Sequence, residues 1–414
     1  MADAVAQRDA TRLAAEAVAR RSYGKLIAFL AARTRDVAGA EDALSEAFAA
    51  ALASWPVSGV PQNPEAWLLT AARRKMIDSA RQRRTHDGTA EHLVLLAELR
   101  ADDEGHALPD DRLALMFACA HPAIELNVRA PLMLQVILGF DAATIASAFL
   151  VAPATMGQRL VRAKAKIRNA GVPFRVPGQA DLGERLAAVL EAIYAAYAEG
   201  WVDPAGTDLR RRNLAEEAIW LGSLVATLLP DEPEALGLLS LMLHAHARRS
   251  ARRDAQGRYV PLAEQDVSLW DARMIEEAEA LLSRAAALGA MGRYQLEAAI
   301  QSAHGVRRCS GRADWPAIEQ LYGALAAMTG SPVVEINRAI AVAETRGPVA
   351  ALALLDGLAD DARLQQYQPY WAARAGLLAR SGDLQAADHA YERAMGLEPD
   401  AAVREFLQRQ RGAA

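Results

Sequence analysis

Helix-forming residues run through almost the whole chain. Ala, Leu, Glu and Arg dominate the sequence, and runs of alternating β-branched residues, which are typical of strands, are absent. Clusters of Pro and Gly interrupt the helical pattern near 55–64, 108–111, 170–178, 200–206, 229–233 and 330–332. These features predict an all-α fold, and a length of 414 residues suggests about three domains.

Charge is distributed unevenly along the chain, although the formal net charge is only −5. Residues 1–84 carry 13 basic and 9 acidic side chains, residues 85–111 carry one basic and 8 acidic side chains, and residues 142–172 carry 5 basic and no acidic ones. The remainder, from residue 173, is acidic. This pattern indicates two basic modules that are joined by an acidic linker and followed by an acidic body. We place the two modules at 10–84 and 112–172, the linker at 85–111 and the body at 181–414.

Several classes of protein are excluded by composition. Cys119 and Cys309 lie far apart, which excludes a disulfide framework and a thiolate zinc site of the usual spacing. Apolar stretches such as 218–230 are too short to span a bilayer. The N-terminus carries acidic residues and no apolar core, so it does not resemble a signal peptide. We therefore expect a cytoplasmic protein without a membrane segment.

The strongest local pattern covers residues 139–168. Asp141 is a plausible N-cap for a short helix over 142–149, and a second helix starts at Pro153, a residue favoured in the first turn. One apolar stripe of this second helix follows helical spacing: Met156, Leu160, Ala163 and Ile167. The neighbouring polar stripe comprises Thr155, Arg159, Arg162 and Lys166, with Gln158 just beyond it.

Two helices joined by a tight turn, the second with a cationic exposed face, predict a DNA-reading helix-turn-helix. A helical hairpin with a solvated basic face is the structural alternative. Thr155, Gln158 and Arg159 lie nearest the helix start, where side chains reach base edges. Gly157 is unusual inside such a helix, and it either permits close approach to DNA or is simply tolerated.

The N-terminal module reads as a helical bundle. One helix, near 39–55, places Ala43, Phe48, Ala51 and Leu52 inward and carries acidic residues on its other face. A second helix, from Pro64 to about residue 84, is strongly basic. A loop carrying Asn63 just before this basic helix could hold an unstacked base, with phosphates alongside.

Together these residues resemble an extracytoplasmic-function sigma factor of the sigma-70 family. The stretch 36–48, followed by Trp55, resembles the part that grips the clamp helices of RNA polymerase. This resemblance implies a polymerase-binding set: Asp36, Glu41, Asp42, Glu46 and Phe48. It implies a set that melts and reads the minus-ten element: Asn63, Trp67, Arg73, Arg74, Lys75, Arg81, Arg83 and Arg84. It implies a third set on the minus-thirty-five element: Thr155, Gln158, Arg159, Arg162, Lys164 and Lys166. The acidic linker would then thread into the polymerase cleft.

The remainder resembles the subgroup of these factors that carries a tetratricopeptide-like C-terminal extension. Spacing supports a helical repeat of 34 residues near the C-terminus. The residues at its expected positions are Trp371, Ala375, Leu378, Gly382, Ala387, Tyr391, Ala394 and Pro399. Two positions depart from the family pattern, because Cys119 stands between alanines rather than in a cysteine pair, and Gly157 replaces a more usual Ala.

The chemistry expected from the sequence is binding rather than catalysis. His244 and His246 point to different faces of a helix and make a poor metal pair, and no nucleophile or phosphate-binding motif occurs. We expect a non-enzymatic transcription initiation factor with no catalytic residues, metal or cofactor. Its partners would be core RNA polymerase and promoter DNA, and its C-terminal domain would regulate through a protein partner or an intramolecular contact. The alternatives are a stand-alone helix-turn-helix regulator with a helical sensor domain, and an enzyme or scaffold whose helical body acts on a small ligand.

Overall fold

The computed structural model describes the chain except for residues 1, 85–110, 149–150, 203–213 and 414. The described residues are helical and contain no β-strand, only a single isolated bridge between Arg253 and Tyr259. The all-α prediction is confirmed. The chain divides into two compact units, Met1–Leu214 and Ala215–Ala414, each treated separately below.

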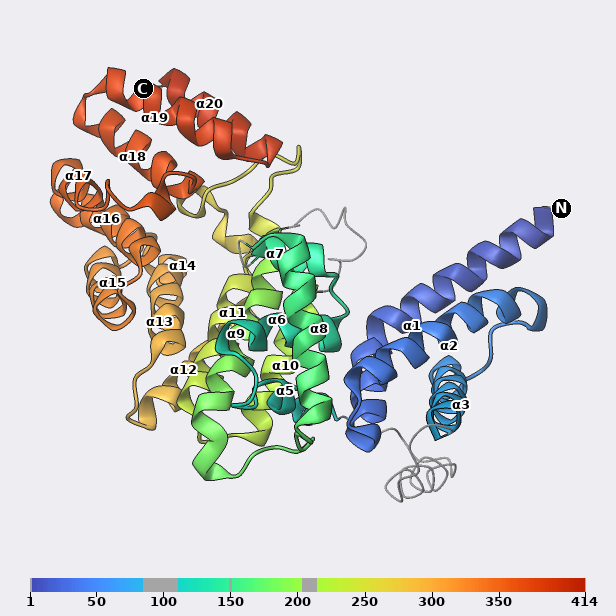
Figure 1. Ribbon diagram of the computed structural model, residues 1–414. Helices are drawn as coiled ribbons and strands as arrows, with labels where there is room; N and C mark the ends of the chain where they lie inside the picture. The colour runs from blue at the N-terminus through green and yellow to red at the C-terminus, as the bar shows by residue number, and fades with distance from the viewer. Residues whose placement is uncertain (1, 85–110, 149–150, 203–213, 414) are drawn as a thin grey trace. The chain divides into compact units, whose positions relative to one another are not determined.

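Unit 1 begins with three helices that pack against one another (Figure 1). They are α1 (Ala2–Thr34), α2 (Val37–Ser58) and α3 (Pro64–Arg84). The side chain of Asp36 starts α2 by accepting a hydrogen bond from the backbone N–H of Gly39 at 3.0 Å. The buried face of α2 follows a spacing of three or four residues: Val37, Ala40, Ala43, Leu44, Ala47, Ala51 and Trp55. Leu52, which was predicted to point inward, is 48% exposed because it lies one position beyond this stripe.

The second part of unit 1 contains α5 (Arg112–Cys119), α6 (Leu126–Leu138), α7 (Ala142–Ala148), α8 (Pro153–Asn169) and α9 (Gln179–Val202). Helix α5 packs on α1, α6 and α9, and all but one of its eight residues are buried. The guanidinium of Arg129, on α6, is buried and donates to the carboxylate of Glu184, on α9, at 2.8 Å. Residue 181, where we place the start of the C-terminal domain, lies inside α9, which packs on α5 and α6.

Unit 2 is a succession of helices in which most pack on the next helix or the next but one in the chain (Figure 1). Its helices are α10 (Leu214–Leu228), α11 (Pro233–His246), α12 (Ala272–Ala287), α13 (Arg293–Gly305), α14 (Arg307–Ser310), α15 (Trp315–Thr329), α16 (Pro332–Arg346), α17 (Pro348–Asp356), α18 (Gln368–Ser381), α19 (Leu384–Leu397) and α20 (Ala401–Ala413). Prolines occupy the first turn of several of these helices, where the missing N–H leaves no hydrogen bond unmade.

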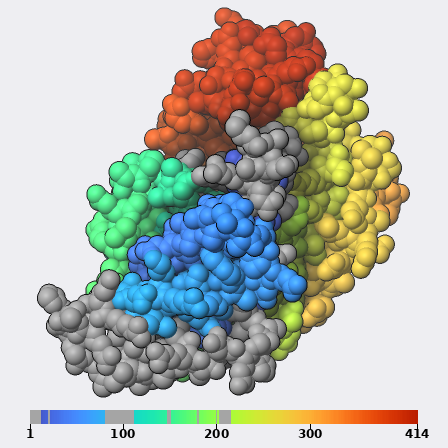
Figure 2. All heavy atoms as spheres, turned by 90° about the vertical axis from the view of Figure 1, so that its right-hand side faces the viewer, coloured from blue at the N-terminus to red at the C-terminus, as the bar shows by residue number. Residues whose placement is uncertain are grey.

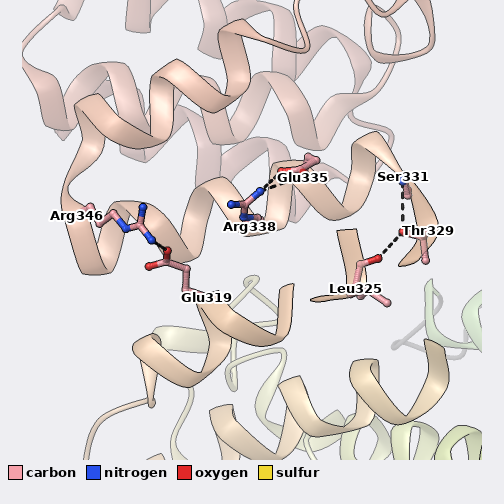
Figure 3. Close-up of polar contacts among 7 residues, drawn as sticks. All are labelled: Glu319, Leu325, Thr329, Ser331, Glu335, Arg338 and Arg346. Carbon is pink, nitrogen blue, oxygen red and sulfur yellow. Dashed lines mark hydrogen bonds and ion pairs between the residues drawn. The ribbon is translucent and has the colours of Figure 1, made fainter. Parts of the chain in front are cut away.

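The pair α15 and α16 shows how adjacent helices are joined (Figure 3). The Thr329 hydroxyl donates to the backbone carbonyl of Leu325 at 2.8 Å and accepts from the N–H of Ser331, which links the end of one helix to the start of the next. At the other end, the Arg346 guanidinium is paired with Glu319. These polar contacts lie at the two ends of an interface whose centre is apolar.

The repeat spacing near the C-terminus corresponds to the pair α18 and α19. Gly382, with φ near +90°, ends α18 in the left-handed conformation, and Asp383 caps α19. The predicted core positions lie in one buried cluster: Ala375, Leu378, Ala387, Tyr391 and Ala394. The placement of these side chains therefore agrees with a helix-turn-helix unit over 368–397.

Candidate nucleic-acid interface

Helices α7 and α8 begin at the predicted residues. The carboxylate of Asp141 accepts hydrogen bonds from the N–H groups of Ala143 and Thr144 at 3.0 and 2.8 Å, and this fixes the start of α7. Pro153 is the first residue of α8. The buried residues of α8 are the four of the predicted apolar stripe: Met156, Leu160, Ala163 and Ile167. The helix is thereby anchored with its polar stripe outward.

The polar stripe of α8 borders a cavity of about 320 Å³. Thr155, Arg159, Arg162 and Lys166, which are four of the six residues assigned to minus-thirty-five DNA, line it together. The start of α6 closes the other side, and its lining residues are Ile124, Glu125 and Val128. Three cations around one concave surface favour an anionic ligand such as a phosphate group. Gln158 is exposed just outside the cavity.

Lys164 lies on a different face of α8 from these cations. Its Nζ is 2.7 Å from Oε2 of Glu41, and both side chains are largely buried, with 14% and 15% of their surface exposed. Burial raises the pKa of Glu41, and the hydrogen bond and charge of Lys164 oppose this shift. Lys164, assigned to DNA, and Glu41, assigned to the polymerase, are thus each other's partner.

The other residues of the polymerase-binding set differ in exposure. Asp36 is buried and serves as the cap of α2, with Arg168 at 3.8 Å. Asp42 and Glu46 are exposed. Oε2 of Glu46 forms an ion pair with Nζ of Lys75, on α3, at 2.8 Å. Phe48 is half-buried. The surface of α2 that is open to a partner is therefore carried by Asp42, Glu46 and Phe48.

Helix α3 has the predicted bounds, Pro64–Arg84. Its start is capped by Asn63, whose side-chain oxygen accepts from the N–H of Ala66 at 3.1 Å. Trp67 packs edge-on against the buried Trp55, with ring centroids 5.5 Å apart. This contact anchors the first turn of α3, next to the exposed residue Asn63, on the buried face of α2.

The basic residues of α3 fall into two described groups. Arg74 and Lys75 are exposed, whereas Arg73 is only 8% exposed and lies over the ring of Phe29. Burial of Arg73 distinguishes it from its neighbours, since a cation beneath the surface cannot reach a phosphate without moving. The side chains of Arg81, Arg83 and Arg84 lie outside the described residues, as does the acidic linker up to residue 110.

Three members of the cavity could not be found from the sequence. Val128 lies in the first turn of α6, and Ile124 and Glu125 lie just before that helix, about 30 positions before the cations that they face. No periodic pattern links the two segments. Glu125 brings a carboxylate to a lining whose other charged side chains are cations. Among the described residues there is no cluster of His, Cys, Asp and Glu that could hold a metal ion, and no described helix has the length and apolar character needed to cross a membrane.

Comparison with known proteins places these features in a family. Residues 18–86 match sigma-70 region 2, which implies binding to core RNA polymerase and promoter DNA. Residues 185–286 match a family of unknown function, DUF6596. This second match begins in α9 and extends through α12, so it includes helices of both units. No solved structure matches the chain.

A relative covers nearly the whole sequence. The uncharacterized protein R00370 of Rhizobium meliloti (strain 1021) is 39% identical over 380 residues, which are 90% of this chain and 89% of the relative. The chain therefore belongs to the same family as this Rhizobium meliloti protein, and the match of residues 18–86 to sigma-70 region 2 supports a sigma-factor-like role in transcription initiation.

Proposed function

We propose that the chain is an initiation factor of the extracytoplasmic-function type, which binds core RNA polymerase and directs it to specific promoters. The observation that carries the proposal is the cationic cavity of α8, in a chain whose residues 18–86 match sigma-70 region 2. Region 2 supplies the polymerase and minus-ten functions, and α8 supplies a second, separate DNA contact.

Helix α8 reads duplex DNA in this proposal. A helix of this size enters the major groove with its N-terminal side chains near base edges, so Thr155, Gln158 and Arg159 read the sequence. Arg162 and Lys166, further along the same stripe, hold phosphates. Glu125 adds to the sequence preference. Its carboxylate repels phosphates and the acceptor atoms of bases, and it accepts a hydrogen bond from a donor such as the amino group of cytosine.

Helix α2 contacts the polymerase in this proposal, and α3 contacts the minus-ten element. The exposed acidic residues Asp42 and Glu46 contact the polymerase, and the exposed cations Arg74 and Lys75 neutralise backbone phosphates next to the minus-ten element. Asn63 and Trp67, at the start of α3, lie where an unstacked base would be held.

Unit 2 regulates this activity. Its successive helix pairs, with a helix-turn-helix unit of tetratricopeptide type at 368–397, form a scaffold that suits a protein partner or an intramolecular contact. A regulatory role accounts for a large helical unit attached to a DNA-binding one.

The test is transcription in vitro from a genomic fragment library, with purified core polymerase and the full-length chain. We expect start sites that share upstream elements and depend on both components. A stand-alone regulator would instead bind duplex promoter DNA tightly without polymerase and would not create new start sites. That result would replace the proposal with the regulator alternative.

A further inference from the structure

The cavity beside α8 is bordered by charged side chains of both signs that do not pair with one another. Arg159, Arg162 and Lys166 come from α8, and the carboxylate of Glu125 comes from the segment just before α6. Among the described residues, none of these four side chains has an ion-pair partner. Opposite charges that border one cavity without closing it leave room for a ligand that contacts both.

The apolar part of the lining is buried and held in place. Ile124, Val128 and Ala163 are the apolar lining residues, and all three are buried. Nε of the buried Arg129 donates to the carbonyl of Ile124 at 3.1 Å, and the N–H of Val128 donates to the carbonyl of Glu125 at 2.9 Å. A wall that is already ordered binds a ligand without the entropic cost of ordering it.

The cavity has the size of a small-molecule site. Its volume of about 320 Å³ lies at the lower end of the range of roughly 300–1,000 Å³ that such sites occupy. Its lining residues come from α8, α6 and the segment before α6. In Figure 2 the green surface of α6 to α8 adjoins the blue surface of α1 to α3, and the ion pairs between α8 and α2 are made by Lys164 and Arg168, not by cavity residues.

The lining selects three features in a ligand. The cations favour a phosphate group, the apolar residues favour a flat apolar body, and the carboxylate of Glu125 favours hydrogen-bond donors. A carboxylate has two acceptor oxygens, so two adjacent donors suit it best. The Watson–Crick edge of guanine presents such a pair, N1–H and the 2-amino group, whereas adenine presents an acceptor beside its amino group. Duplex DNA conceals this edge, but a free nucleotide exposes it.

We propose that the cavity binds a free guanine nucleotide, with its phosphate held by the three cations of α8 and its base recognised by Glu125. The same cations are assigned to minus-thirty-five DNA, so the nucleotide and the promoter exclude each other. The nucleotide therefore inhibits promoter binding through α8. This competition rests on the proposed function, whereas the nucleotide site itself does not.

The first experiment measures nucleotide binding to the full-length chain by equilibrium dialysis, without polymerase or DNA. The probes are GMP, AMP and inorganic phosphate, and the two nucleotides share the same ribose and phosphate. We expect GMP to bind at least roughly tenfold more tightly than AMP, because only guanine makes two hydrogen bonds to the carboxylate. Inorganic phosphate should bind more weakly than either nucleotide.

Two substitutions separate the base contact from the phosphate contact. Glu125→Gln should abolish the preference for GMP over AMP, because an amide offers a single acceptor oxygen. Arg162→Gln should weaken both nucleotides by the same factor and retain the preference. Glu191→Gln is the matched control, since Glu191 is an exposed carboxylate of α9 outside the cavity lining, and it should bind both nucleotides as the parent chain does. Equal affinity of the parent chain for GMP and AMP, or a preference that survives Glu125→Gln, would overturn the site.

The second experiment measures the promoter complex that the full-length chain forms with core polymerase, in the absence of nucleoside triphosphates. GMP should reduce the amount of complex, and AMP at the same concentration should have much less effect. With Glu125→Gln the two nucleotides should act alike. Selective binding of GMP that leaves complex formation unchanged would overturn the inhibitory role. Selective binding of GMP by a chain that forms no promoter complex under any condition would overturn the proposed function, and the competition with it, while confirming the nucleotide site.

Discussion

Nη1 of Arg129 lies 2.8 Å from Oε1 of Glu184, and this bond ties α9 to α6, the helix that precedes α7 and α8. The Nε atom of the same guanidinium donates to the carbonyl of Ile124 at 3.1 Å, next to the cavity of α8. Helix α9 therefore supports the helices to which we assign the minus-thirty-five contact, although its sequence belongs to the family match that continues into unit 2.

A chain that ends at Gly178 should be much less stable than one that ends at Leu214. It loses the buried side chains of α9, including Leu186, Val189 and Ile193, and each buried aliphatic side chain contributes roughly 1.5–3 kcal/mol. We expect a difference of at least about 4 kcal/mol in the free energy of unfolding, measured with urea. Equal stability of the two chains would show that α9 is not part of unit 1.

The local pattern of α8 could be predicted from the sequence because it is set by short-range rules. The helical repeat fixes which residues share a face, so Met156, Leu160, Ala163 and Ile167 were identified as the buried stripe. Capping chemistry similarly identified Asp141 as the start of α7. The start of α3 at Pro64 follows from the preference of proline for the first turn of a helix.

Long-range pairing could not be predicted in this way. Helical spacing places Lys164 on a different face of α8 from Arg162 and Lys166, but only the packing of α2 against α8 shows that its partner there is Glu41. Arg73 is indistinguishable in sequence from Arg74, but it is buried against Phe29. Whether a cation faces solvent or a neighbouring helix depends on tertiary contacts that no local spacing encodes.

Arg159→Ala should weaken promoter use selectively. A lost contact between Arg and a base edge costs about 1–3 kcal/mol, and the loss should be confined to promoters with the preferred upstream element. The measurement is transcription from a matched and a mismatched promoter. Lys166→Ala is the comparison variant, because a lost phosphate contact lowers binding to both promoters equally and reduces the salt dependence. Equal effects of the two variants would remove Arg159 from the base-reading set.

Gly157→Ala should stabilise the free protein. A Cβ atom at this position meets no other heavy atom within 4 Å, and Ala is favoured over Gly in a helix by about 1 kcal/mol. Thermal unfolding should therefore shift to higher temperature. If the same variant transcribes normally, Gly157 is simply tolerated, whereas a loss of promoter binding at higher stability would mean that the glycine is kept for close approach to DNA.

Unit 2 should lose stability in mild acid through His244 and His304. Burial, with the nearby charge of Arg248, lowers the pKa of each imidazole to about 4. The unfolded chain, with a histidine pKa near 6.5, then binds more protons than the folded chain between about pH 6.5 and pH 4. Stability therefore falls as the pH is lowered through this window, by up to about 1.4 kcal/mol per pH unit for each histidine.

This pH dependence can be assigned to individual residues by urea unfolding of the full chain at pH 7, 6 and 5. His244→Gln should flatten the decline, because it removes a group that must be neutral in the fold. The pKa of His304, which stacks edge-on with Trp315, is lowered to about 4 by the same causes as that of His244, so the two histidines should contribute similarly. His389→Gln, at an exposed position of α19, is the matched control and should leave the slope unchanged. A slope that neither His244→Gln nor His304→Gln alters would place the acid sensitivity elsewhere in the chain.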